Sequence, residues 1–274
     1  MNDDYKQLVS WLKTGGKPTI HISCEAAAAP LPVGASKIGG QPDMPAGFVW
    51  PRRKGGEPFD TKRQWQERPL SFLAQFDFAQ VSAFDKDGVL PESGHLAFFY
   101  DYEGNLDEGV LRPDCARVFY FPADAALVRT SPPAGMYDDG CASELTLQFS
   151  EHFSFPAFSY LPQQVRRALR DAYLWEEIWP QEWGCKLLGW ADVLETAPEE
   201  ECFRTCDVAA AIDPEAVPYA HAGDWRLLLQ LGELYLQDGA MFSDLGALYF
   251  MIRRQDLAAQ KFDNIRIVRQ DEYA

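Results

Sequence analysis

Carboxylates interleaved with large aromatic residues between positions 171 and 215 are the side chains of this sequence best suited to chemistry. The segment holds 12 acidic residues and two basic ones, Lys186 and Arg204. Carboxylates attract a cationic partner from a distance, and tryptophan rings anchor it after docking. The predicted partner-binding residues are Trp175, Glu176, Glu177, Trp179, Glu182, Asp192, Glu195, Glu199, Glu200, Glu201 and Asp207. The alternative is a solvated acidic face whose tryptophans point into the core.

Histidine and cysteine are too scattered to predict a metal site. His21-x-x-Cys24 and Cys202-x-x-x-Cys206 are the suggestive pairs, whereas structural zinc usually takes four ligands in two tight pairs. The sequence also lacks a phosphate-binding glycine loop and a Gly-x-Ser-x-Gly turn. We therefore predict no cofactor and no catalytic residue, and favour a non-enzymatic role. A catalytic Ser-His-Asp or Cys-His site assembled from residues distant in the sequence is left as an alternative.

Short sequence words recur in the same order in the two halves of the chain. The first half reads Lys37–Gly40, Leu70–Gln75, Gly94–Phe99 and Arg117–Tyr120, and the second reads Lys186–Gly189, Leu227–Gln230, Gly246–Phe250 and Arg266–Val268. This order predicts an internal duplication within one compact domain, 1–274. The copies span approximately 30–125 and 183–270, and a linker segment, 126–182, joins them.

Gln75 and Gln230 occupy the same place in both copies, at the end of an apolar strand. A buried amide needs hydrogen-bond partners. We interpret each glutamine as a structural tie between its strand and a neighbouring turn, with a ligand contact as the alternative. Asp43 and Asp192 also match, and an aspartate in such a turn typically accepts hydrogen bonds from backbone N–H groups.

The elements that position these residues are mostly strands, so the predicted fold class is α+β and strand-rich. Short aromatic-rich runs bounded by turn residues predict the strands, and apolar residues at helical spacing predict a linking helix near 163–179. Residues 30–69 are rich in Gly and Pro and predict an ordered loop pinned by Phe48 and Trp50. The expected strands are 70–77, 95–100, 117–121, 144–149, 187–189, 227–231, 247–252 and 265–268, with a short extended segment at 21–24 and further helices near 2–15 and 255–261.

Composition restricts the partners and the compartment. The net charge of −16 repels nucleic acid and anionic membranes. We expect no signal peptide, and no apolar run approaches the ~18 residues of a membrane span. Six cysteines in 274 residues are too few for a disulfide scaffold. These features predict a cytoplasmic protein, which we expect to be a monomer.

Several of the repeated words resemble the YwqG-like family of bacterial proteins. The resemblance lies in Ser36–Pro45, Phe48-x-Trp-Pro51, Leu70–Asp77, Leu90–Gly94, Leu96–Phe99, Leu227–Gln230, Asp244–Phe250 and the Asp256-Leu…Phe262-Asp263 ending. It covers roughly residues 30 to 270 and implies one strand-rich fold with internal duplication in the cytoplasm. The family's function is unknown, so the resemblance supplies no catalytic residue.

Two functions are compatible with these observations. The first is a protein that neutralises a basic, nuclease-type toxin by covering its active or nucleic-acid-binding surface, as an immunity protein does. The alternative is a small-molecule or carbohydrate binder, or an enzyme, with its site in a cleft between the copies. The cleft residues would be Gly39, Gly40, Trp50, Gln75, Trp190 and Gln230.

Overall fold

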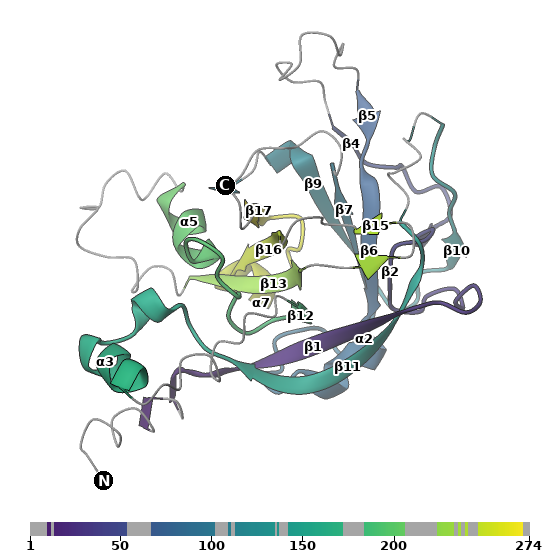
Figure 1. The fold of residues 1–274 in the computed structure, drawn as a ribbon. Coiled ribbons are helices and arrows are strands. Elements are labelled where there is room, and N and C mark those ends of the chain that lie inside the picture. Colours follow the sequence, from purple (N-terminus) through teal and green to yellow (C-terminus); the bar gives the residue numbers. More distant parts are fainter. Residues whose placement is uncertain are drawn as a thin grey trace.

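A curved antiparallel sheet organises the molecule. The computed structural model describes residues 10–11, 14–53, 67–101, 109–110, 113–134, 136, 142–171, 184–205, 224–232, 235–236, 239–240 and 246–270. Within these ranges an 11-stranded sheet has the order β8-β17-β16-β13-β12-β1-β11-β2-β6-β7-β9. Its edge strands β8 (Gly109–Val110) and β9 (Ala116–Phe121) are close in sequence, and β9 also contacts β17 (Ile265–Gln270). The sheet therefore curls until its edges approach each other (Figure 1).

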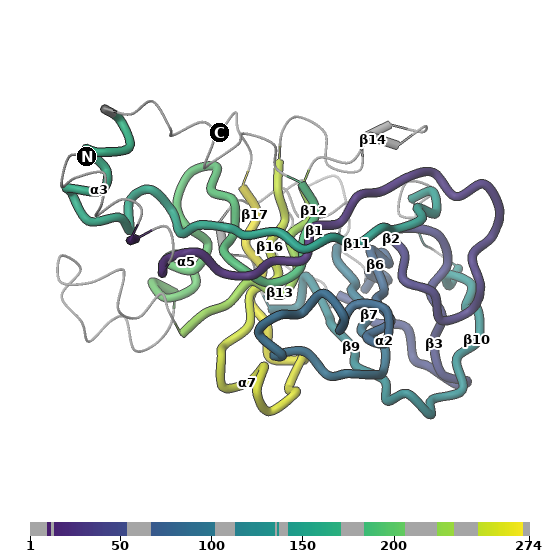
Figure 2. The backbone as a smooth tube through the Cα atoms, turned by 90° about the horizontal axis from the view of Figure 1, so that it is seen from below, coloured from purple at the N-terminus to yellow at the C-terminus, as the bar shows by residue number. Residues whose placement is uncertain are grey.

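Two long strands, β1 (Lys17–Ala26) and β11 (Leu145–Ser154), form the middle of this sheet and pair along their whole length. They run side by side across the molecule in Figure 2. On the β11 side lie β2 (Lys37–Ile38), β6 (Ser71–Asp77), β7 (His95–Tyr100) and β9; on the β1 side lie β12 (Cys185–Leu187), β13 (Trp225–Leu231), β16 (Ala247–Arg253) and β17. We call these two groups the first and second half-sheets. Each half-sheet has the same antiparallel order counted outward from the centre.

The central strands cross over between the half-sheets. β1 precedes the first half-sheet in sequence but pairs with β12 of the second, whereas β11 precedes the second and pairs with β2 of the first. Both β6 and β13 also carry a register shift shortly before their glutamine, between Phe72 and Ala74 and between Leu227 and Leu229. The two half-sheets are therefore joined by exchanged pairing and are not independent units.

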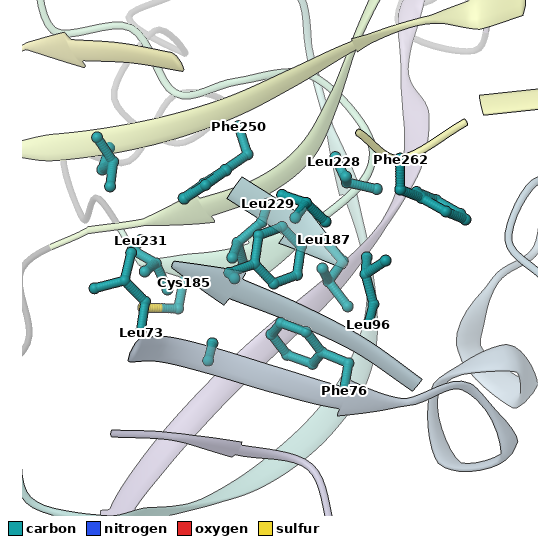
Figure 3. Close-up of a cluster of buried hydrophobic side chains, with 14 of the residues drawn as sticks. Leu73, Phe76, Leu96, Cys185, Leu187, Leu228, Leu229, Leu231, Phe250 and Phe262 are labelled. Atoms are coloured by element: carbon teal, nitrogen blue, oxygen red, sulfur yellow. The ribbon is translucent and has the colours of Figure 1, made fainter. Parts of the chain in front are cut away.

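One hydrophobic core fills the concave side of the sheet. Side chains of both half-sheets converge there, including Phe76, Leu96, Leu229 and Phe250 (Figure 3). The rings of Phe98 and Phe250, from different half-sheets, lie 4.9 Å apart centroid to centroid in an edge-on contact. Alternate residues of the strands supply this core, as expected for sheets with one face turned inward. Burial of these large side chains supplies the main stabilisation of the fold.

The convex face of the first half-sheet is covered by the glycine- and proline-rich loop. Met44, Phe48 and Trp50 pack against Phe72 and Phe99. Short strands order this loop: β3 (Asp43–Pro45) pairs with β10 (Leu127–Arg129), and β4 (Arg52–Arg53) pairs with β5 (Arg68–Pro69). The prediction of an ordered loop pinned by Phe48 and Trp50 is confirmed for the part of it that the structure describes.

A short helix, α5 (Pro198–Arg204), covers the convex face of the second half-sheet. Pro198 stands at its first turn with three glutamates, and Arg204 stands at its end, an arrangement that suits the helix dipole. Cys202 packs with Trp225 and Leu227 in a second apolar cluster. The sequence analysis did not predict this helix, because seven residues are too few for a clear helical period.

The predicted strands are confirmed, with changed boundaries. The strand expected at 187–189 ends at Leu187, since Leu188 and Gly189 have φ angles of 61° and 77°. The other elements are α2 (Phe78–Val81), η1 (Ser82–Phe84), η2 (Pro113–Cys115), η4 (Phe158–Tyr160), α3 (Gln163–Asp171), α7 (Arg254–Ala258), and the pair β14 (Tyr235–Leu236) and β15 (Gly239–Ala240).

One expectation needs correction. The segment 126–182, expected to be a linker, contains β11, which is central to the sheet. The linking helix expected near 163–179 is described only as α3, which packs against Trp11 and Phe158 at one end of the molecule (Figure 1). Positions 172–179 of that helix and most of the one expected near 2–15 lie outside the described residues.

Candidate functional site

A buried polar cluster occupies the convex face of the first half-sheet, at the junction with β11. Lys37 lies in a row between Thr146 of β11 and Gln75 of β6. Its fully buried amine is 3.0 Å from a Glu144 carboxylate oxygen and 3.4 Å from Asp43 Oδ2. Gln75 accepts a hydrogen bond from the Asp43 N–H (2.8 Å), and its amide donates to Asp43 Oδ2 (2.7 Å) and to the Ala35 carbonyl (2.8 Å).

Arg129 completes the charge balance of this cluster. Its guanidinium contacts Asp43 Oδ1 at 2.6 Å and Glu144 Oε2 at 3.5 Å. Burial opposes ionisation of Asp43, but hydrogen bonds from Arg129 and from the Gly34 N–H outweigh it, so the pKa of Asp43 is lowered. Two cations thus neutralise two carboxylates, as buried charges require.

The second half-sheet carries the corresponding cluster. Lys186 lies between His21 of β1 and Gln230 of β13, and its amine contacts Asp192 Oδ1 at 2.5 Å. Gln230 accepts from the Asp192 N–H (2.9 Å), and its amide donates to Asp192 Oδ2 (2.6 Å) and to the Gly184 carbonyl (3.0 Å). The interpretation of both glutamines as ties between strand and turn agrees with these contacts.

The six residues proposed for a cleft between copies do not converge. Gly39, Gly40, Trp50 and Gln75 belong to the first half-sheet, whereas Trp190 and Gln230 belong to the second, on the far side of the β1–β11 pair. Gly39 and Gly40 donate backbone hydrogen bonds to Leu73 and Ala142, and the two indole N–H groups donate to the Leu70 and Gly15 carbonyls. These polar groups are already engaged within the protein.

The acidic segment is distributed between the surface and the interior. Glu195 is exposed, Asp192 and Glu201 are partly buried, and Glu199 and Glu200 are buried at 2 % and 8 % relative exposure. Glu199 accepts a hydrogen bond from the Ala191 N–H, and Glu200 forms an ion pair with Arg204. Glu199 therefore ties α5 to the Ala191 backbone, whereas Glu200 is paired within the helix by Arg204. Trp175, Glu176, Glu177, Trp179, Glu182 and Asp207 lie outside the described residues.

Three carboxylates, those of Glu195, Glu200 and Glu201, nevertheless interact with one another at α5. Glu201 accepts a hydrogen bond from the Gln270 amide, which also donates to the Thr196 carbonyl. Burial raises the pKa of Glu201, and the negative charges of Glu195 and Glu200 raise it further. Because Arg204 already pairs with Glu200, a further cationic group brought to this position would act mainly on Glu195 and Glu201.

A lysine and two aromatic residues lie under α5, and the sequence analysis gave them no joint role. The Lys17 amine is 3.3 Å from the centroid of the Trp190 ring, and the Tyr160 ring meets Trp190 nearly edge-on at 6.4 Å. Burial lowers the pKa of Lys17 to about 8, against the attraction of Glu199. The contact is one between a cation and an aromatic face. No spacing in the sequence links residues 17, 160 and 190, so this group could not be found from it.

The matched lysines were also overlooked as cluster members. The repeated words begin with Lys37 and Lys186, and a lysine next to apolar residues at the same place in both halves was the available signal. Glu144 and Arg129 had no such signal because they come from the segment expected to be a linker. Within the described ranges, no group of three or more His, Cys, Asp or Glu side chains is placed to hold a metal ion.

The fold and these clusters define a strand-rich protein of two joined half-sheets, each with a buried Lys–Asp–Gln cluster. Among the described residues, no helix combines the length and apolar character needed to cross a lipid bilayer. The chain belongs to the DUF1963 family, a domain of unknown function whose family pattern matches residues 36–270. No curated protein matches the chain significantly.

Proposed function

We propose that the protein is a cytoplasmic, monomeric binding protein that neutralises a basic, nuclease-type partner. The observation that carries this proposal is the gathering of Glu195, Glu200 and Glu201 at α5: burial raises the pKa of Glu201, and the negative charges of Glu195 and Glu200 raise it further. A lysine or arginine of a partner would offset these charges and gain charge-assisted hydrogen bonds. The net charge of −16 would steer a basic partner toward the protein.

The mechanism proposed is occlusion. A nuclease uses a basic surface to hold the phosphate backbone, and an acidic surface docked there competes with the nucleic acid. Such a role needs rigid presentation of carboxylates and no reacting group. Glu199 supports it indirectly, because its buried carboxylate ties the start of α5 to the Ala191 backbone.

The alternative, a ligand site between the copies, has less support. Its two glutamines use their side-chain oxygens and amide hydrogens within the protein, and the space between the half-sheets contains one continuous apolar cluster. A ligand there would have to displace buried hydrogen bonds, each of which costs about 1–3 kcal/mol when left unsatisfied. We therefore prefer the binding protein.

We also infer that the half-sheets descend from a duplicated unit and that the chain is YwqG-like. Three observations support the duplication: the paired Lys–Asp–Gln clusters, the register shifts in β6 and β13, and the positive φ angles at Gly39–Gly40 and Leu188–Gly189. The sequence words that resemble YwqG-like proteins lie almost entirely within the matched range, 36–270.

The experiment that tests the binding role combines capture with charge removal. The tagged protein is used to capture partners from its native host at low and at raised salt, and the captured proteins are identified by mass. We expect one basic protein, bound at low salt and weakened at raised salt, because screening reduces attraction between exposed charges. The captured protein is then purified. Its affinity for this chain is measured, and its nuclease activity is compared with and without this chain.

A pair of matched variants identifies the surface. Glu195→Gln with Glu201→Gln removes two charges beside α5 while keeping an acceptor for Gln270. Glu25→Gln with Glu92→Gln removes two charges at exposed positions elsewhere. We expect the first pair to weaken the complex at least tenfold and the second to change it less than threefold. Equal effects of the two pairs would reject α5 as the binding surface, and the absence of any salt-sensitive basic partner would reject the function.

A further inference from the structure

Two thiols meet where β1 pairs with β12, at the junction between the half-sheets. Ile22 of β1 lies opposite Cys185 of β12, which places Cys24, two residues further along β1, diagonally next to Cys185 on the same face. Both side chains belong to the main apolar cluster, with Cys185 fully inside it and Cys24 packed at its margin. Cys185 lies beside Leu73 and Leu231 in Figure 3. The two thiols are hydrogen-bonded to each other.

The two sulfurs differ in accessibility and in acidity. Cys24 is partly exposed, whereas Cys185 is buried, and both are free thiols. The hydrogen bond from Cys185 lowers the pKa of Cys24, against the opposing effect of burial. The same hydrogen bond and burial raise the pKa of Cys185, although the Gly232 N–H donates to its sulfur. The thiolate is the form that reacts with oxidants, so Cys24 is the sulfur that reacts first.

We propose that Cys24 and Cys185 form an oxidation site that takes hydrogen peroxide and closes to a disulfide across the β1–β12 junction. The Cys24 thiolate attacks one peroxide oxygen and breaks the O–O bond, giving a Cys24 sulfenic acid and hydroxide. The Cys185 sulfur then attacks the Cys24 sulfur, forming the S–S bond and releasing the sulfenic oxygen with the Cys185 proton as water. Peroxide is reduced, and the two thiols are oxidised.

The geometry favours ring closure over further oxidation. A disulfide needs two cysteines whose Cβ atoms are close and face each other, and Cys24 and Cys185 are diagonal neighbours on one face of the β1–β12 pair, in the same apolar cluster. A resolving thiol next to the sulfenic acid also prevents a second peroxide from reacting there. The disulfide would join residues 161 positions apart in the sequence. It would link β1 covalently to β12, the strand of the second half-sheet with which β1 pairs. It would therefore stabilise the native fold against unfolding.

The proposal is tested on the native protein with hydrogen peroxide as the only oxidant. We expect the intact mass to fall by two hydrogen atoms, and a non-reducing peptide map to join the peptides that contain Cys24 and Cys185. The melting temperature is expected to rise by roughly 5 °C, and dithiothreitol should reverse the change. The intact mass, the peptide map and the melting temperature are all measured on the native chain, so none of them requires a variant to fold.

Three variants separate this site from other cysteine oxidation. Cys185→Ala should leave Cys24 as a sulfenic acid that dimedone captures, and Cys24→Ala should abolish the mass loss. Cys202→Ala, which removes a buried thiol from a different apolar cluster, should leave the cross-link unchanged. Oxidation of Cys24 to the sulfinic acid without a cross-link, or a disulfide that joins any other pair, would overturn the proposal.

Discussion

At the scale of single residues, Lys17 shows how burial and local charge compete. Burial lowers the pKa of Lys17 from 10.5 to about 8, and the positive charges of Arg226 and Arg254 add to this effect. Glu199 and the face of the Trp190 ring favour the protonated amine. The protonated lysine is therefore held at a cost to the folded state, and that cost depends on pH.

We expect Lys17→Met to stabilise the protein near pH 7 and to lose this advantage at high pH. The folded-state pKa lies below the unfolded value, so the unfolded chain binds more protons between about pH 8 and 10.5, and stability rises with pH there. Removing the amine should raise the free energy of unfolding at pH 7 by about 1 kcal/mol, less than the full shift implies, since residual exposure and the Trp190 contact reduce it.

Urea unfolding at pH 7 and pH 10 measures this difference. Lys86→Met is the matched control, because Lys86 is 52 % exposed and pairs with the exposed Glu151. The control should change stability by less than about 0.5 kcal/mol at both pH values. A Lys17→Met protein that is less stable than the native chain by equal amounts at pH 7 and pH 10 would show that the cation–aromatic contact dominates instead.

At the scale of elements, the turn that follows β12 is fixed by a glycine that no other residue can replace cheaply. Gly189 has a φ of 77°, and a Cβ atom there would approach Ser154 Oγ to 2.3 Å and Thr19 Cβ to 2.7 Å. Ser154 accepts the Trp190 N–H at 2.7 Å, and Thr19 donates to the Leu188 carbonyl at 2.9 Å. Because Gly189 has no side chain, the turn after β12 can contact Thr19 of β1 and Ser154 of β11 at the same time.

Gly189→Ala is expected to cost about 3 kcal/mol of unfolding free energy, because backbone strain and steric overlap add. Gly47→Ala separates the two causes: Gly47 has a similar φ of 80°, and a Cβ atom there would meet nothing within 4 Å. That variant should cost only about 1 kcal/mol, the strain alone. Chemical denaturation of both proteins gives the comparison, and equal costs would refute the role of close approach in this turn.

The elements also show how much of the fold the sequence could predict. Strands such as β6, β7, β13 and β16 are short, apolar and bounded by turns, so composition locates them. β1 was expected only as the short extended segment 21–24, and β11 only as 144–149. Glu151 pairs with Ile20 on the core side of these two strands, so it ends the apolar alternation of Leu147 and Phe149. The central place of the two strands follows from long-range pairing, which no local pattern encodes. The burial of Glu199 was equally hidden, since a run of three glutamates is typical of exposed positions.

At the scale of the whole molecule, the exchange of β1 and β11 makes each half-sheet depend on the other. Each Lys–Asp–Gln cluster is built at a strand that pairs with a central strand, and the core continues without interruption from Phe98 to Phe250. A half-sheet that unfolded alone would expose the apolar side chains of its neighbour. The protein should therefore unfold as one cooperative unit, despite having a length typical of two domains.

Gln75→Leu and Gln230→Leu test this cooperativity from opposite sides of the sheet. Each variant leaves the aspartate N–H and a backbone carbonyl without their partner and removes one hydrogen bond to the aspartate carboxylate, so each should destabilise the protein. Gln75→Leu should lower the free energy of unfolding by about 3 kcal/mol and Gln230→Leu by about 2 kcal/mol. The Asp43 side chain is 0 % exposed, whereas that of Asp192 is 31 % exposed and can hydrogen-bond to water instead. Both variants should shift one urea transition, recorded identically by tryptophan fluorescence and by far-UV circular dichroism. A curve that splits into two steps, with only one step moved by each variant, would show that the half-sheets fold separately in spite of the shared core.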